Sequence, residues 1–158
     1  MRDKRFVAEH RNGPLKKEQH RQLIKWACDC VEHVLPLLDG KLDDRLKNAL
    51  LIAKEWRKGN TTVGNARNAA FGAIALASEF SNPILIAIAR AAGQAVATAH
   101  MADHSLGAAV YALKAVKNAG KSIDAEREWQ NEQLPSEIKE LVLSTRSQKE
   151  QIFKDLKT

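Results

Sequence analysis

An alanine-rich stretch from Gly59 to Gly120 most constrains the fold, because only six of its 62 residues are charged. A helix that is apolar nearly all round has to be enclosed by other helices. Alanine favours helix, since it loses no side-chain entropy there, and its small side chain lets helices approach closely. Ala89, Gly93 and Ala97 recur every four residues and predict a groove for such packing. We therefore expect a buried central helical layer shielded by the flanking segments.

The rest of the chain predicts an all-α fold, a single-domain bundle or array of about six to seven helices, and its 158 residues suit one domain. Apolar residues recur at intervals of three and four, and no segment alternates as a strand would. Residues 1–14 are expected to form a basic irregular arm, and residues 145–158 either dock as a short helix or fray. We expect helices over about 15–35, 43–58, 62–80, 83–101, 103–119, from 122 through 129, and from 135 onward, with 83–119 as one bent helix in the alternative.

The net charge of +6 is concentrated near the start, where residues 1–25 carry eight Lys/Arg and three Asp/Glu. Such an arm is suited to phosphate or to an acidic partner, although a solvated surface segment has the same composition. Phe6 is the only aromatic residue before Trp26, which weakens a single-stranded nucleic-acid interpretation. Nucleic acid is therefore expected to be at most a weak partner.

The chain has no run of about 18 apolar residues, so we expect no transmembrane helix and no membrane partner. Its basic start is not followed by the apolar region of a signal peptide. Cys28 and Cys30 lie two apart in a predicted helix, where side chains diverge by roughly 200°. They are expected to be buried, reduced thiols of a cytoplasmic protein.

The sharpest local pattern is His100, Asp103 and His104. In a continuous helix, His100 and His104 share a face, as two metal ligands at i and i+4 do, with Asp103 at its edge. Asp29 and His33 form a second such pair that would complete a divalent-metal site if the two helices pack together. Two other interpretations stay open: polar residues that satisfy one another in a tight core, and acid–base catalysis.

Enzyme templates are otherwise missing. The glycines lack the spacing of a phosphate-binding loop, and the chain has neither a Gly-x-Ser-x-Gly elbow nor a Cys-x-x-Cys pair. We therefore expect no catalytic activity and no obligatory cofactor. Arg67 and Arg90, isolated in apolar helices, either pair with Glu79 or Asp103 or lie on helix surfaces. The three tryptophans fall at core-facing positions and are expected to anchor the core: Trp26, Trp56 and Trp129.

The stretch from Arg90 to His104, continued by residues 111–116, resembles the characteristic segment of the bacterial Imm5-like immunity proteins. Residues 6–11, 13–15, 26–36, 63–71, Trp129-Gln130 and Leu134-Pro135 match in order, so the resemblance covers roughly residues 5–145. Some relatives are labelled as an exonuclease subunit, whereas this chain has no nucleotide-binding motif. Asn65 stands where the family leads us to expect an acidic residue.

The resemblance implies a helical cytosolic protein that binds and neutralises a co-encoded toxin, with no catalytic residues to carry over. The positive charge argues against mimicry of nucleic acid, because an inhibitor that fills the cationic cleft of a nuclease should be acidic. An acidic toxin surface that meets residues 1–25 is the expected partner. The alternatives are a metal-binding protein or small metal-dependent hydrolase using His100, Asp103 and His104, and a weak nucleic-acid binder through the arm.

Overall fold

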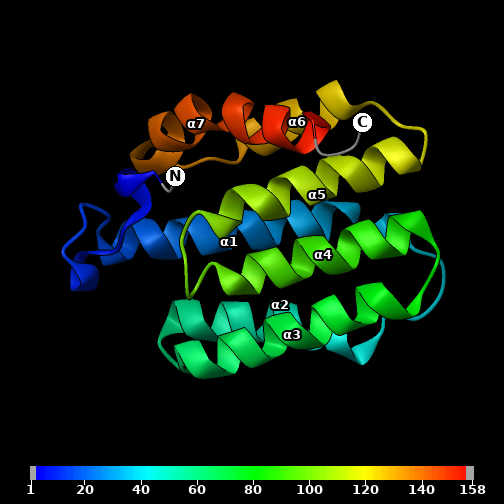
Figure 1. Ribbon diagram of the computed structural model, residues 1–158, viewed down its shortest axis with the longest axis horizontal. Helices are drawn as coiled ribbons and strands as arrows, with labels where there is room; N and C mark the ends of the chain where they lie inside the picture. Colours follow the sequence, from blue (N-terminus) through cyan, green and yellow to red (C-terminus); the bar gives the residue numbers. More distant parts are fainter. Residues whose placement is uncertain (1–2, 156–158) are drawn as a thin grey trace.

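The computed structural model describes residues 3–155, with side chains through Arg146. This part of the chain forms seven α-helices that run alternately in opposite directions, so that the connections gather at two ends (Figure 1). We call the end that carries the N-terminal arm the arm end, and the other the opposite end. The expected all-α array is confirmed, with helices α1 Lys17–Val34, α2 Asp44–Lys58, α3 Val63–Glu79, α4 Pro83–Ala97, α5 His104–Asn118, α6 Ile123–Glu132 and α7 Ser136–Asp155.

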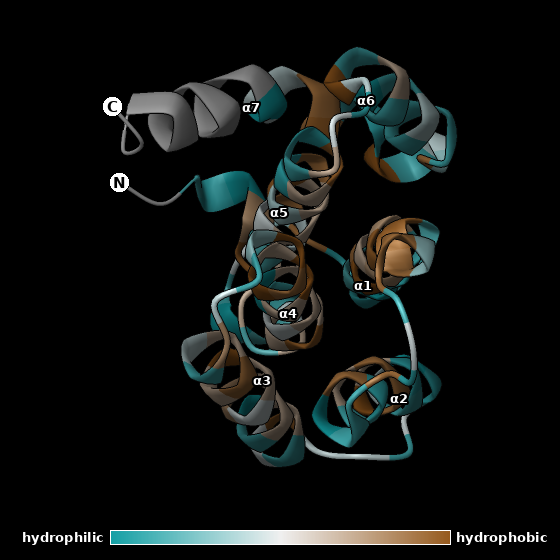
Figure 2. Cartoon of the chain, turned by 90° about the vertical axis from the view of Figure 1, so that its right-hand side faces the viewer, coloured by the Kyte–Doolittle hydropathy of each residue, from teal (hydrophilic) through white to brown (hydrophobic). Residues whose placement is uncertain are grey.

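Helix α4 lies at the centre, packed against α1, α2, α3 and α5, and the hydrophobic sides of its neighbours face inward (Figure 2). Arg90 is the only exposed side chain between Ile84 and Ala97. The expected groove of small residues is used by α3: a Cβ added to Gly93 would lie 3.3 Å from the Ile74 Cγ1 atom. The alanine-rich stretch is thus a buried layer, because neighbouring backbones occupy the space that larger side chains would need.

Helix starts follow from short polar side chains that accept hydrogen bonds from otherwise unpaired backbone N–H groups. The Asn82 side chain accepts from the amides of Ile84 and Leu85, and Pro83 occupies the first helical position, where no N–H is needed. The other side-chain caps of this kind belong to Asp43 for α2, Thr62 for α3 and Ser122 for α6.

The fourth helix is shorter than expected. It ends at Ala97 rather than near Met101, and residues 98–103 form a turn, so a single bent helix over 83–119 is wrong. The Thr98 hydroxyl donates to the Gln94 carbonyl at 3.0 Å, and the Thr98 carbonyl is bonded to the His20 Nε2 atom at 2.6 Å. The Thr98 carbonyl is thus bonded to a side chain of α1 at the point where α4 ends.

The N-terminal arm is packed against the helices. It contains two short 3₁₀ turns, Lys4–Phe6 and Glu9–Arg11, and an isolated bridge between Ala8 and Leu15. Phe6 and Leu15 are buried in the core, while the basic side chains of the arm point to solvent. The arm is therefore attached through its apolar residues and through Arg5, which pairs with Asp3 and donates to the Ser144 hydroxyl oxygen, while Lys4 and Arg11 stay exposed.

Helix α7 continues without interruption past Thr145 to Asp155; residues 156–158 and the side chains after Arg146 lie outside the described residues. Within the described part, no helix combines the length and the hydropathy that a bilayer crossing requires.

Gly13 allows the arm to close on itself, which makes its substitution a test of the packing. A Cβ at Gly13 would lie 2.0 Å from the Val7 carbonyl oxygen, a backbone atom that cannot move alone. We expect Gly13→Ala to lower the free energy of unfolding by about 1–3 kcal/mol, as overpacking does. Urea unfolding followed by circular dichroism measures it.

Gly64→Ala is the matched control, because its Cβ would meet only the Thr62 hydroxyl oxygen at 3.7 Å in the first turn of α3. There the added methyl group should be neutral or stabilising by up to about 1 kcal/mol. Equal unfolding midpoints for Gly13→Ala and the wild type would contradict the packing described here.

Candidate functional site

The residues of the predicted metal site lie in and just after the turn between α4 and α5. His100 and Asp103 belong to the turn, and His104 is the first residue of α5, so the expected shared helical face does not form. The His104 Nδ1 atom is hydrogen-bonded to the Gln94 Oε1 atom at 2.7 Å. Gly107 makes room for this amide, since a Cβ there would lie 2.6 Å from the same oxygen. This contact joins α4 to the start of α5.

The further candidate ligands Asp29 and His33 do not join this group. His20, near the start of α1, contacts the turn at Thr98, whereas His33 lies 13 residues later and thus about 20 Å along the same helix. The Asp29 carboxylate instead accepts from the Lys25 Nζ atom at 2.8 Å. The four residues therefore do not converge on one site, because convergence would have required α5 to begin beside the end of α1. Among residues 3–146, no group of three or more His, Cys, Asp or Glu side chains is arranged to hold a metal ion.

His33 belongs to an arrangement at the opposite end that the sequence did not predict. Its Nδ1 atom is hydrogen-bonded to the Glu126 Oε2 atom at 2.6 Å, and its ring stacks on Trp129 with centroids 3.5 Å apart and planes 5° from parallel. Trp129 is thus a half-buried stacking partner rather than the expected core anchor. This contact ties α6 to α1.

At the arm end, side chains from the arm, α1, α2 and the start of α3 line a cavity of about 430 Å³. We call it the Trp56 cavity. Trp56 is half-buried and lies against His20, with ring centroids 4.7 Å apart. The remaining lining residues include apolar Ala8, Leu15 and Val63 and the polar or charged Glu9, His10, Lys17, Arg21 and Thr61. The cavity thus combines an apolar wall with charged groups, as ligand-binding pockets commonly do.

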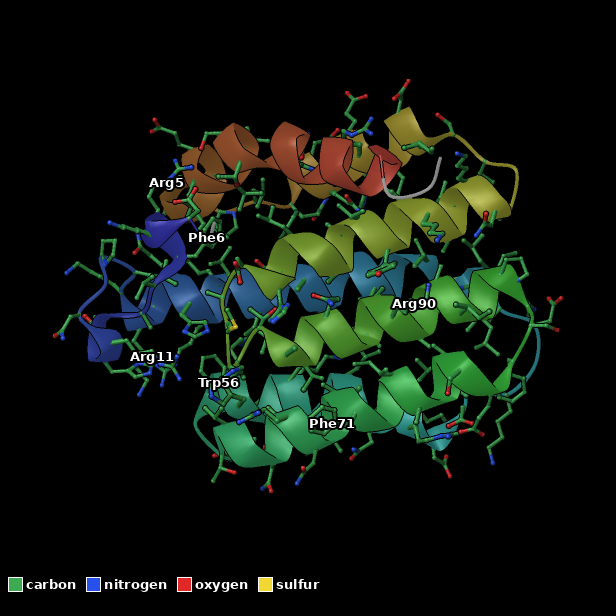
Figure 3. The ribbon with its side chains drawn as sticks, in the orientation of Figure 1. Arg5, Phe6, Arg11, Trp56, Phe71 and Arg90 are labelled. Carbon is green, nitrogen blue, oxygen red and sulfur yellow. The ribbon has the colours of Figure 1, made fainter. Side chains whose placement is uncertain are left out.

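Lys17 and Arg21 line this cavity, and further positive side chains lie at the same end of the helices. We call the basic surface the six residues Arg11, Lys16, Lys17, Arg21, Arg57 and Lys58, which come from the arm and the adjoining ends of α1 and α2. None of these six forms an ion pair with another described residue. The acidic residues of the same segments are Asp3, Glu9, Glu18 and Glu55, and Arg57 and Lys58 line a second pocket together with Asp29 and Glu32. Arg11 and Trp56 are seen at this end in Figure 3. The surface is therefore free to meet negative charge.

The sequence predicted the basic segment but not its neighbours. Trp56 lies some 40 residues after the start of α1, and only the antiparallel pairing of α1 and α2 brings it beside Lys17 and Arg21. The guanidinium of Arg21 reaches the end of α2, because a Cβ on Gly59 would lie 4.0 Å from its Nη2 atom. In the sequence, Phe6 is the only aromatic residue that accompanies the basic segment before Trp26, whereas in the structure Trp56 lies in the same cavity as Lys17 and Arg21.

The other isolated charges are explained more simply. Arg67 and Arg90 are exposed and make no ion pair with another described residue. Of the two expectations for these residues, the position on a helix surface is therefore the one observed. Glu79, their expected partner, instead pairs with Arg45, and this contact lowers the pKa of the Glu79 carboxyl group.

These features define an all-helical protein with a cavity that is lined by a half-buried tryptophan and by cations that form no ion pair with another described residue. The family model described as "Imm-5 like putative immunity protein" matches residues 13–137, somewhat less than the 5–145 expected. The chain belongs to this family. No curated protein and no solved structure matches it.

The buried thiols yield a prediction on reactivity. Burial raises the pKa of Cys28 from 9.0 to about 12, and it also raises the pKa of Cys30. Because the thiolate is the reactive form, its fraction on Cys28 at pH 8 is lowered on the order of 1,000-fold by folding. We expect iodoacetamide to modify neither native cysteine at pH 8, with mass spectrometry as the readout.

The same reaction in 8 M urea is the control, and both cysteines should then be modified within minutes. Folding favours the protonated thiol, so any stability that this difference contributes is present below pH 9 and declines as the pH rises towards 12. Rapid modification of the native protein would contradict the burial of these residues.

Metal binding at His100, Asp103 and His104 stays a prediction, with a direct test. If the site binds metal, element analysis of protein purified without a histidine tag should show a near-stoichiometric divalent ion. The ion should be lost in a His100→Ala/His104→Ala double variant and kept in a His10→Ala control, whose residue is exposed on the arm. A metal-free, folded wild type would end the hypothesis.

Proposed function

We propose that this protein is an immunity protein that binds and neutralises a co-encoded bacterial toxin in the cytosol, and that the basic surface is its contact with the toxin. Membership of the immunity family supports the role. The observation that carries the choice of surface is the set of unpaired cations gathered at the arm end, next to the Trp56 cavity.

The charge of this surface decides the kind of partner. Complementary charge speeds association and suppresses wrong partners, so a basic surface selects an acidic one. If the toxin were a nuclease and its cationic, nucleic-acid-binding cleft were the contact, the cleft would repel the basic surface. We therefore expect an acidic surface on the toxin, which the immunity protein covers or distorts.

The arrangement of the surface supports specific binding rather than general charge attraction. Lys17 and Arg21 lie one turn apart on α1, so their spacing is fixed by the helix. The arm that carries Arg11 is itself packed on the helices, since its residues Phe6 and Ala8 are buried. Fixed cations lose less conformational entropy on binding than charges on a disordered tail.

Reversal of two of these charges tests the proposal. The open reading frame next to the gene is co-expressed with the wild type and with a Lys17→Glu/Arg21→Glu variant. We expect the wild type to rescue growth and the variant to lose rescue, with toxin affinity weakened at least about tenfold by like-charge repulsion. Isothermal titration calorimetry with an inactivated toxin measures the affinity.

A Lys47→Glu/Lys117→Glu variant is the matched control, because it makes the same change in net charge on exposed residues of the opposite end. It should rescue growth as the wild type does. Failure of the wild type to rescue would overturn the function, and rescue by Lys17→Glu/Arg21→Glu would overturn the choice of surface. Binding of a single-stranded oligonucleotide that weakens steeply with salt, without toxin binding, would favour the nucleic-acid alternative.

A further inference from the structure

The Trp56 cavity is held open by contacts on two sides. The His20 ring lies against Trp56, and its Nε2 atom is bonded to the Thr98 carbonyl at 2.6 Å, which fixes the aromatic wall. On the other side, the Glu9 amide donates to the Leu15 carbonyl at 2.9 Å and the Leu15 amide to the Val7 carbonyl at 3.0 Å. These bonds fix the arm as the second wall. A ligand therefore meets a preformed site, which reduces the entropic cost of binding.

The lining suggests a ligand with two kinds of groups. Trp56 and Val63 present apolar surface whose burial under another apolar group lowers the free energy. Lys17 and Arg21 present cations that favour carboxylates. A purely apolar ligand would leave the cations without partners, and a bare anion would leave the tryptophan uncovered.

Glu9 narrows the ligand class further. Its carboxylate lies in the same lining, and its Oε1 atom accepts from the Lys17 backbone amide at 3.2 Å. A negative group at this place repels any anion set against it, so the negative groups of a ligand have to lie at Lys17 and Arg21 and away from Glu9. A peptide backbone suits it, since peptide N–H groups can donate to a carboxylate.

We propose that the Trp56 cavity is an anchor site that receives one bulky aliphatic side chain from an acidic peptide segment, whose carboxylates lie on Lys17 and Arg21. That this segment belongs to the toxin rests on the proposed function. The binding chemistry itself needs no toxin. Interfaces of this form place an apolar group in a central pocket and surround it with charged pairs.

A peptide titration tests the anchor without the toxin. The ¹⁵N-labelled protein is titrated with acetyl-Asp-Glu-Leu-Glu-Asp-amide and, separately, with the same peptide carrying alanine in place of leucine. We expect the leucine peptide to shift the indole N–H resonance of Trp56 and to bind about tenfold more tightly than the alanine peptide. The Trp56 resonance is assigned by its loss in Trp56→Phe.

A variant that fills the Trp56 cavity provides the second test. Val63 lines the cavity and is 38% exposed, so Val63→Trp should occupy the space without disturbing the core. We expect it to bind the leucine peptide at least fivefold more weakly. Leu143→Trp is the matched control, because Leu143 is 40% exposed on α7 and does not line the cavity.

Equal affinity for the two peptides, or unchanged binding by Val63→Trp, would overturn the anchor site. The failures can be told apart. If the wild type fails to rescue cells from the toxin, the proposed function is wrong whatever the peptides do. If rescue succeeds and Val63→Trp rescues equally well, the function stands and the cavity is not its anchor.

Discussion

The enclosure of α4 is the constraint on which the rest of the structure depends. A helix with one exposed side chain between Ile84 and Ala97 has to be surrounded, and neighbours reach it only where its own residues are small. Gly93 admits α3, and on the facing helix Gly107 leaves room for Gln94. Antiparallel helices around one centre place every connection at one of two ends. The polar side chains that bond between helices therefore gather at these two ends: His20, Thr98 and His104 at the arm end, and His33 and Glu126 at the opposite end.

The outer helices are attached by polar contacts as well as by apolar ones. Trp26 donates its indole N–H to the Gln130 carbonyl at 2.8 Å, and the Gln130 side chain donates to the Ala109 carbonyl at 3.1 Å. Arg146 is buried, donates to Gln130 and Asn131, and lies 5.6 Å from the centre of the Trp26 ring. Buried polar groups need such partners, and their directionality fixes α6 and α7 on α1 and α5 more narrowly than apolar packing alone would.

The sequence predicted what depends on local periodicity and capping, and it missed what depends on packing between distant segments. Asn82-Pro83 marked the start of α4, because a side-chain cap and an N1 proline act within one turn. The end of the same helix was placed four residues too late, since the bond from His20 to Thr98 joins residues 78 positions apart. Spacing assigned Trp56 to the core, yet it lies near the end of α2, where the neighbouring helices leave part of its ring uncovered.

That uncovered ring explains why a binding site arises at the arm end. Trp56 lies three residues before Gly59, which ends α2 in a left-handed conformation with φ of 82°, so no further turn of α2 can cover the indole. The arm passes over this region but is held through Ala8 and Leu15 rather than through contact with the full ring. The same arm contributes Glu9 and His10 to the lining and Arg11 to the basic surface. Cavity and cations are therefore consequences of one arrangement: an arm fixed by its apolar residues across the end of an antiparallel helix pair.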